Sequence, residues 1–216
     1  MKTVGILGGM GSMATVDLFE KIVKNTQVTC DQDHLHIIID NYSEIPDRTD
    51  FILNKGLDPT KKMIEAAMRL EQAGAELIAM PCNTAHFFYD EIQASINVPI
   101  IHMMKETSKI IKSNTILLAT QGTYTAKLYA NVLIPNDKMQ NVVSELIYQY
   151  KKDQTINVRL KKEVLSQLEY LDGIILGCTE LPLIFKQMDT NVPLIDPTQI
   201  LAEATILKAG AKLIAT

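Results

Sequence analysis

The sequence predicts an α/β protein made of two similar, Rossmann-like domains, each built on a parallel sheet, with a cleft between them. Three observations lead to this prediction. Short apolar segments of strand length alternate with segments of helical periodicity along the chain. The apolar segments show no polar alternation, which is typical of parallel strands buried on both faces. A faint internal repeat also relates the first half of the chain to the second.

The predicted strands are rich in Ile, Leu and Val and occupy Thr3–Leu7, His36–Asp40, Glu76–Met80, Pro99–His102, Thr115–Ala119, Gly173–Leu176 and Pro193–Ile195. Helices are expected between them, over Ala14–Asn25, Pro59–Ala73, Ala85–Ser95, Thr123–Leu133, Asp137–Lys152 and Asn157–Leu171. In the helix that begins at Pro59, apolar side chains from Met63 to Leu70 share one face, and Gly74 provides a C-terminal cap.

The repeat indicates where the domains divide. Cys82 follows a strand and precedes "NVPIIHM", and Cys178 follows a strand and precedes "NVPLIDP". Each half also opens with a strand that runs into small residues, "VGILGGMG" and "TILLATQGT". We therefore expect an N-terminal domain over residues 1–99 and a C-terminal domain over 100–197. A C-terminal helix over 198–216 is expected to pack back on the first domain.

The composition argues against several classes of function. The 216 residues carry a net charge of −4, and no basic cluster is dense enough for nucleic-acid binding. The N-terminal apolar run is short and broken by glycines, so we expect neither a signal peptide nor a membrane helix. The three cysteines form no CxxC or Cys/His cluster, so neither a disulfide framework nor a metal site is predicted. We expect a cytoplasmic protein with reduced thiols.

Two cysteines lie where a binding site is expected. In a parallel α/β sheet the carboxyl ends of the strands form the binding edge, and Cys82 and Cys178 both lie there. Across a cleft, one thiolate could remove a proton from one face of a carbon while the other thiol delivers a proton to the opposite face. A thiol pKa of about 8.5 suits both roles. The alternative is that a cysteine at a strand end is simply a small, buried apolar residue. We assign this alternative to Cys30, which has no counterpart in the other half.

Neighbouring residues in these loops are candidates for binding a substrate. Asn83, Thr84 and Thr179 can cap a helix or hold a ligand. Arg48, in "EIPDRT", can bind a carboxylate through two hydrogen bonds, or it can be a solvated surface residue. Glu180 can adjust the protonation of the adjacent cysteine, or cap a helix.

The glycine loop "GGMGSMAT" allows two interpretations. Gly9-x-Gly11-x-x-Ala14 after a strand fits a dinucleotide fingerprint, although a single match of this kind is weak. The same backbone amides at a helix N-terminus could bind a small anion, such as an α-carboxylate.

Four motifs in this order, "GILGGMGSMAT", "IPDRT", "PCNTAH" and "GCTELP", resemble the aspartate/glutamate racemase family. The "IPDRT" loop and "KTVGILGGMG" are most similar to the aspartate racemases of that family. The resemblance spans nearly the whole chain, to "VPLIDPTQILAE". It implies a cofactor-independent, homodimeric enzyme whose active site lies between two α/β domains. It also implies that Cys82 and Cys178 are the catalytic acid/base pair.

The resemblance also implies the substrate contacts. Arg48 and a lysine of "IYQYKK" would bind the side-chain carboxylate, with Lys152 favoured over Lys151. The family positions that line the substrate pocket correspond to Met10, Asn83, Thr84, Ala85, Thr123, Thr179 and Glu180. Two features depart from the family pattern: Ser12 replaces a frequent proline, and the segment from Lys152 to Cys178 is shorter than usual.

We therefore expect an amino-acid racemase that interconverts L- and D-aspartate by two-cysteine proton transfer. It is expected to need no pyridoxal phosphate, metal, nucleic acid or membrane. The alternatives are a broad-specificity or glutamate racemase, a non-catalytic small-molecule-binding protein, and a nucleotide-binding module. The presence of both cysteines favours racemisation.

Overall fold

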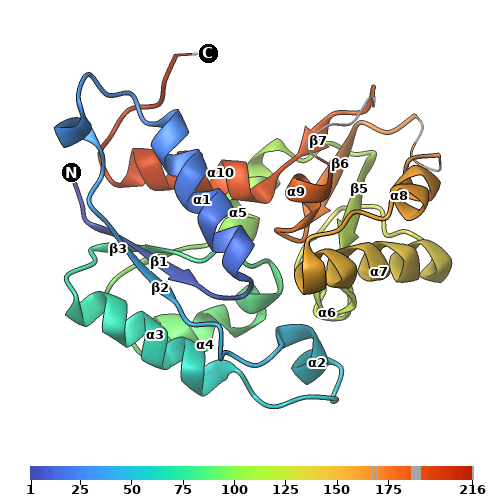
Figure 1. Ribbon diagram of the computed structural model, residues 1–216, viewed down its shortest axis with the longest axis horizontal. Helices are drawn as coiled ribbons and strands as arrows, with labels where there is room; N and C mark the ends of the chain where they lie inside the picture. Colours follow the sequence, from blue (N-terminus) through green and yellow to red (C-terminus); the bar gives the residue numbers. More distant parts are fainter. Residues whose placement is uncertain (167, 169, 186–190, 216) are drawn as a thin grey trace.

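The structure is a computed structural model that describes residues 1–166, 168, 170–185 and 191–215. The first sheet has the strand order β2-β1-β3-β4 and the second has the order β5-β6-β7, with every neighbouring pair parallel. The strands are β1 (Val4–Gly8), β2 (Ile37–Asn41), β3 (Leu77–Ala79), β4 (Ile100–Ile101), β5 (Thr115–Ala119), β6 (Gly173–Gly177) and β7 (Leu194–Ile195). The predicted α/β fold with two parallel sheets is confirmed, and the sheets lie side by side in Figure 1.

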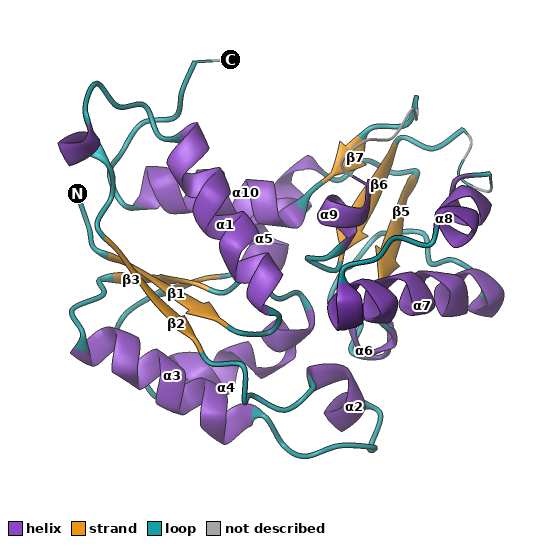
Figure 2. Ribbon diagram, viewed as in Figure 1, coloured by secondary structure: helices purple, strands orange, loops and turns teal. Residues whose placement is uncertain are grey.

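Helices cover both faces of the first sheet (Figure 2). One face carries α1 (Ser12–Asn25), α5 (Met103–Thr107) and α10 (Pro197–Lys208), and the other carries α3 (Thr60–Gln72) and α4 (Tyr89–Ala94). Strand alternation decides which side chain reaches which face. Val4 and Ile6 therefore pack beneath α1, whereas Leu7 lies in the cluster beneath α3.

The second sheet shares part of its core with the first. One of its faces packs on α7 (Asp137–Asp153), α8 (Val158–Leu165) and α9 (Leu181–Phe185). Side chains on its other face, such as Leu117 and Ile175, join the apolar cluster that contains α5 and α10. One apolar cluster therefore connects the two sheets, and α10 packs against α1 and α5 although it follows the second sheet in the chain.

Short helices occupy several loops. They are α2 (Arg48–Ile52), α6 (Gln121–Thr125) and the 3₁₀ helices η1 (Asp31–Asp33), η2 (Thr84–Phe88) and η3 (Ser108–Ile110). Side-chain caps fix where several helices begin. Asp196 accepts hydrogen bonds from the backbone N–H groups of Thr198 and Gln199 at the start of α10.

The predicted strands are confirmed within one or two residues, but several predicted helices differ. The helix expected over Thr123–Leu133 is wrong, because α6 ends at Thr125. Leu133 instead exchanges backbone hydrogen bonds with Thr115 and Leu117 at the edge of β5. The backbone groups of this segment are therefore satisfied by pairing with the sheet instead of by a helix.

Two further helices have other bounds than expected. The helix predicted over Ala85–Ser95 is the 3₁₀ helix η2 followed by α4. The helix predicted over Asn157–Leu171 is α8, which ends at Leu165, and residues 167 and 169 of that prediction lie outside the described residues.

The C-terminal helix is shorter than expected. The helix expected over residues 198–216 ends at Lys208, because Gly210 takes a φ of +87° and the chain then pairs with Thr26 through Leu213. Residue 216 lies outside the described residues. The domain division at residues 99 and 100 stays a prediction; β4 at Ile100–Ile101 pairs with β3 of the first sheet.

Within the described residues, no helix combines the length and the apolar character needed to cross a bilayer.

Candidate active site

A small cavity between the two sheets brings the two matched cysteines together. Cys82 follows β3 and Cys178 follows β6, and both thiols are buried and free of disulfides. The cavity is lined by Met10, Asp47, Arg48, Thr49, Cys82, Asn83, Thr84, Thr120, Lys151, Cys178, Thr179 and Glu180. Its volume is only about 10 Å³, which is about the space of one water molecule. The side chains that line the site therefore fill it almost completely.

Most of the expected site residues line this cavity, and three do not. Ala85 is fully buried in the apolar cluster of the first sheet. Thr123 lies behind the cavity wall, where its hydroxyl is 2.9 Å from that of Thr84. Lys152 is exposed, whereas Lys151 lines the cavity. One residue turns a helix by about 100°, so adjacent lysines on α7 face different directions.

A carboxylate holds the thiol of Cys178. The thiol donates a hydrogen bond to Glu180 Oε2 over 2.9 Å, and both side chains are buried. Burial raises the pKa of Cys178 well above its ordinary value, and the charge of Glu180 raises it further. This thiol is therefore protonated at neutral pH. Its proton is directed at the Glu180 carboxylate.

The backbone of the Cys82 loop is held by His86. The His86 Nδ1 atom lies 2.8 Å from the Cys82 carbonyl oxygen, and its Nε2 accepts a hydrogen bond from the Met103 N–H. This pattern requires the proton on Nδ1. Burial lowers the pKa of His86 to about 4, so the ring is neutral at pH 7. His86 thus fixes the loop rather than supplying charge to it.

Arg48 is a buried cation, and backbone carbonyls of the protein use some of its hydrogen-bond donors. Its Nη1 donates to the carbonyls of Ile45 and Pro46, and its Nη2 donates to that of Met10. The buried Nε–H has no hydrogen-bond partner among the described residues. A guanidinium carries five N–H donors, so part of its edge is left for a ligand carboxylate.

Lys151 adds a second positive charge. Burial and the charge of Arg48 would lower the pKa of Lys151, but the charge of Glu180, together with the charges that Cys178 and Cys82 carry once they ionise, outweighs them and raises it. The lysine is therefore protonated. Arg48 and Lys151 together make the cavity suited to an anion with more than one negative oxygen.

Asn83 presents an unpaired amide group to the cavity. Its Oδ1 accepts a hydrogen bond of 2.5 Å from the Tyr129 hydroxyl, and its buried Nδ2 has no partner among the described residues. Sequence reasoning missed Tyr129, because the segment was expected to be helical. It also missed Thr49 and Thr120, whose only signal was their place in the "IPDRT" and "TQGT" loops.

Threonine hydroxyls join the two halves of the site. Thr49 donates to Thr120 Oγ1 over 3.2 Å, and the hydroxyls of Thr84, Thr120 and Thr123 lie 2.9–3.2 Å from one another. Thr49 and Thr84 belong to the first half of the chain, and Thr120 and Thr123 to the second.

The glycine loop closes one side of the cavity. Gly9 has a φ of +88°, and a Cβ there would lie 2.4 Å from the Tyr42 carbonyl carbon, so glycine is required. Its N–H donates to the Thr15 hydroxyl and is not free for a ligand. A larger recess of about 400 Å³ lies beside this loop and shares Met10, Asp47, Arg48, Lys151 and Glu180 with the cavity.

Among the described residues, no group of three or more His, Cys, Asp or Glu side chains is arranged to hold a metal ion.

Known proteins are similar to this chain over most of its length. The family model described as Asp/Glu/Hydantoin racemase matches residues 7–205. The broad specificity amino-acid racemase RacX of Bacillus subtilis (strain 168) is 32% identical over 226 aligned positions, covering 94% of this chain and 96% of that protein.

Solved structures are similar over almost the whole chain. The aspartate racemase of Picrophilus torridus superposes with a TM-score of 0.90 at 31% identity, over 99% of this chain and 96% of its own. An aspartate racemase homologue from Pyrococcus horikoshii OT3 gives a TM-score of 0.74 at 28% identity, over 97% of this chain and 99% of its own.

Proposed function

Because the chain belongs to the Asp/Glu/hydantoin racemase family, we propose that it interconverts L- and D-aspartate, with Cys82 and Cys178 as the acid/base pair and without a cofactor. Family membership makes it an amino-acid racemase, which is an isomerase. The observation that carries the finer proposal is the meeting of two buried thiols, from the ends of β3 and β6, in one cavity that Arg48 and Lys151 also line.

The proposed reaction conserves protons. In one direction the thiolate of Cys82 removes the α-proton, and the thiol of Cys178 delivers its own proton to the opposite face of the same carbon. The reaction leaves Cys82 protonated and Cys178 as a thiolate, which is the starting state for the reverse direction. The hydrogen bond from Cys178 to Glu180 supports this assignment of the resting proton.

The substrate has two carboxylates, and the cavity offers matching donors. Arg48 retains unpaired N–H groups and Lys151 is protonated, so we assign these two to the side-chain carboxylate. Lys151 thus replaces Lys152 in this role. The unpaired Nδ2 of Asn83 is assigned to the α-carboxylate, where negative charge grows as the proton leaves. Such preorganised donors are a large source of stabilisation for a carbanion.

A broader substrate range is the second candidate. It is favoured by the similarity to a broad specificity racemase over 94% of this chain. One methylene in a pocket discriminates by only about 1–3 kcal/mol, so glutamate would be excluded only modestly by size. Ser12, which lines the recess beside the glycine loop, is where a difference in range could originate.

We further propose that the protein is a cytoplasmic homodimer. The dimer rests on the family resemblance of the motifs, and light scattering coupled to size exclusion tests it.

The decisive experiment incubates the reduced protein with L-aspartate in D₂O and follows it by proton NMR and chiral chromatography. We expect D-aspartate with deuterium at the α-carbon. L-glutamate and L-alanine in parallel measure the substrate range. Deuterium exchange without inversion would reject the two-thiol mechanism. Inertness of aspartate beside turnover of another amino acid would reject the substrate.

A further inference from the structure

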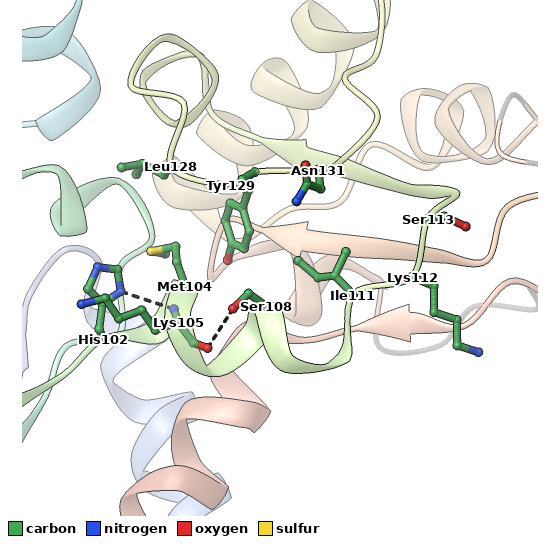
Figure 3. Close-up of a pocket in the computed structure, with 11 residues that line it drawn as sticks. His102, Met104, Lys105, Ser108, Ile111, Lys112, Ser113, Leu128, Tyr129 and Asn131 are labelled. Carbon is green, nitrogen blue, oxygen red and sulfur yellow. Dashed lines mark hydrogen bonds between the residues drawn. The ribbon is translucent and has the colours of Figure 1, made fainter.

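A groove outside the candidate active site has the size of a small-molecule site. It has a volume of about 390 Å³ and lies between α5, η3 and the segment after α6. Its lining shares no residue with the cysteine cavity. Figure 3 shows the lining, which comprises His102, Met104, Lys105, Ser108, Ile111, Lys112, Ser113, Leu128, Tyr129, Ala130 and Asn131. Small-molecule sites commonly have volumes of about 300–1,000 Å³.

The charge of the groove is positive. Lys105 and Lys112 line it, and none of its lining residues is acidic. Glu106, the acidic neighbour on α5, is paired with Lys109 and Lys208. A cationic groove is unusual on a chain whose net charge is −4. Its charge therefore favours an anionic ligand.

The two lysines stand at opposite ends of an apolar floor. In Figure 3, Lys105 lies at one end beside His102, and Lys112 lies at the other, with Tyr129 and Ile111 between them. Lys105 is held at its end by the Tyr89 ring, whose centroid is 5.7 Å from Nζ. A ligand that matches this pattern combines an anionic group with an aromatic or apolar body.

Two contacts connect the groove to the Cys82–Asn83 segment. Tyr129 forms part of the floor, and its hydroxyl is the hydrogen-bond donor to Asn83 Oδ1. The His102 ring lies 5.2 Å, centroid to centroid, from the His86 ring, and His86 holds the Cys82 carbonyl. Both contacts end on the segment that carries one of the two thiols.

We propose that this groove binds a small organic anion with an aromatic or apolar body. We also propose that its occupancy alters the candidate active site through the Tyr129–Asn83 hydrogen bond. A ligand against the Tyr129 ring changes the position of its hydroxyl, and the Asn83 amide turns with it. The groove is thus a regulatory site, and this proposal does not depend on which amino acid the enzyme racemises.

Binding is tested first, with anilinonaphthalene sulfonate as a fluorescent probe that carries one anionic group on an aromatic body. We expect saturable binding that the Lys105→Ala/Lys112→Ala variant weakens by about fivefold or more. Ser108→Trp, which fills the groove from an exposed position, should abolish it. Lys55→Ala, at an exposed lysine outside the lining, is the matched control and should bind as the wild type does. Equal affinity in all four proteins would overturn the site.

Competition then defines the ligand class. Phenyl phosphate should displace the probe at concentrations where inorganic phosphate does not, because only the former covers the apolar floor. Equal displacement by both would overturn the requirement for an apolar body.

The connection is tested by a readout that needs no catalytic activity. The rate at which iodoacetamide alkylates Cys82 is followed by peptide mass in a Cys30→Ser background. Saturating probe should change this rate by about twofold or more, in line with the usual size of coupling between sites. Tyr129→Phe should still bind the probe but lose the response. An unchanged rate in the wild type, or an unchanged response in Tyr129→Phe, would overturn the connection.

Discussion

The two thiols of the site stand in different surroundings. The thiol of Cys178 donates a hydrogen bond to a buried carboxylate, whereas a neutral histidine holds the Cys82 loop by a hydrogen bond to its backbone. The two cysteines occupy matched positions in the sequence, but their chemical surroundings differ in the folded chain.

Replacement of either cysteine tests the proposed pair. Cys82→Ser and Cys178→Ser should each reduce racemisation by about 10²–10⁴-fold, because a hydroxyl is a poor acid/base group at neutral pH. Each change is nearly isosteric, so urea denaturation should show little change in stability. The expectation that Cys30 is buried is wrong, because Cys30 is exposed. Cys30→Ser is therefore the control and should keep full activity. Near-normal racemisation in both site variants would reject the mechanism.

His86 should make stability depend on pH. Its pKa is lowered by burial from 6.5 to about 4 in the folded protein, so the unfolded chain binds the proton first as the pH falls. Its contribution is complete above pH 6.5 and is lost between pH 6.5 and 4. That loss is worth up to about 3 kcal/mol.

The measurement is urea denaturation at several pH values between 4 and 8, for the wild type and for His86→Gln. Glutamine does not titrate, so the variant should show a flatter dependence over this range. Parallel curves for the two proteins would contradict this account of His86.

At the scale of elements, the sequence predicted the buried strands best. All seven are confirmed because each contains an apolar run, although β2 lies at the edge of its sheet and has no fully buried residue. Where prediction failed, a tertiary contact overrode the local pattern. The sequence pattern predicts a helix that ends at Leu133, but the backbone of Leu133 pairs with β5.

The site was predictable to the level of its loops. The cysteines, Arg48 and Glu180 stand in short motifs after strands, and the cavity collects them. Tyr129 was not predictable, because its contact with Asn83 spans 46 positions of sequence and depends on how the halves pack. The sequence favoured Lys152 over Lys151 and could not rank the two by position, because the face that a helix turns towards the site is fixed only by its packing.

The orientation of α7 can be checked by substituting its two lysines. Lys151→Met should reduce kcat/KM for aspartate by about 10- to 100-fold, the effect of losing a charge-assisted contact of about 1.5–3 kcal/mol. Lys152→Met, on an exposed face of the same helix, should stay within about twofold of the wild type. The reverse ranking would restore the original assignment to Lys152.

At the scale of the whole molecule, the closed cavity implies movement. A volume of about 10 Å³ cannot hold aspartate, so we expect the groups around the cavity to move apart when the substrate enters. The contact between α2 and α6, beside which Thr49 donates a hydrogen bond to Thr120, is one that we expect to open.

The absence of a side chain at Gly122 allows the two halves of the site to close tightly. A Cβ at this position would lie 2.8 Å from Thr49 Oγ1 and 3.0 Å from Thr84 Cγ2. Gly122→Ala should therefore hold the halves apart and reduce kcat/KM by about 10- to 100-fold, as small misplacements of reacting groups do. Thr125→Ala, an exposed change on the same helix, is the control. Wild-type kinetics and an unchanged small-angle scattering profile with substrate would contradict this role.

The carboxylate of Glu180 stands beside only one of the two thiols, yet the two enantiomers of an amino acid have equal free energy in water. For the proposed reaction the equilibrium constant is one, and the Haldane relation then requires the same kcat/KM in both directions. The lopsided site can make one enantiomer bind more tightly and turn over more slowly, but the two effects must cancel. Glu180 can therefore change the separate KM and kcat values for each enantiomer, but it cannot change the final ratio of the two forms.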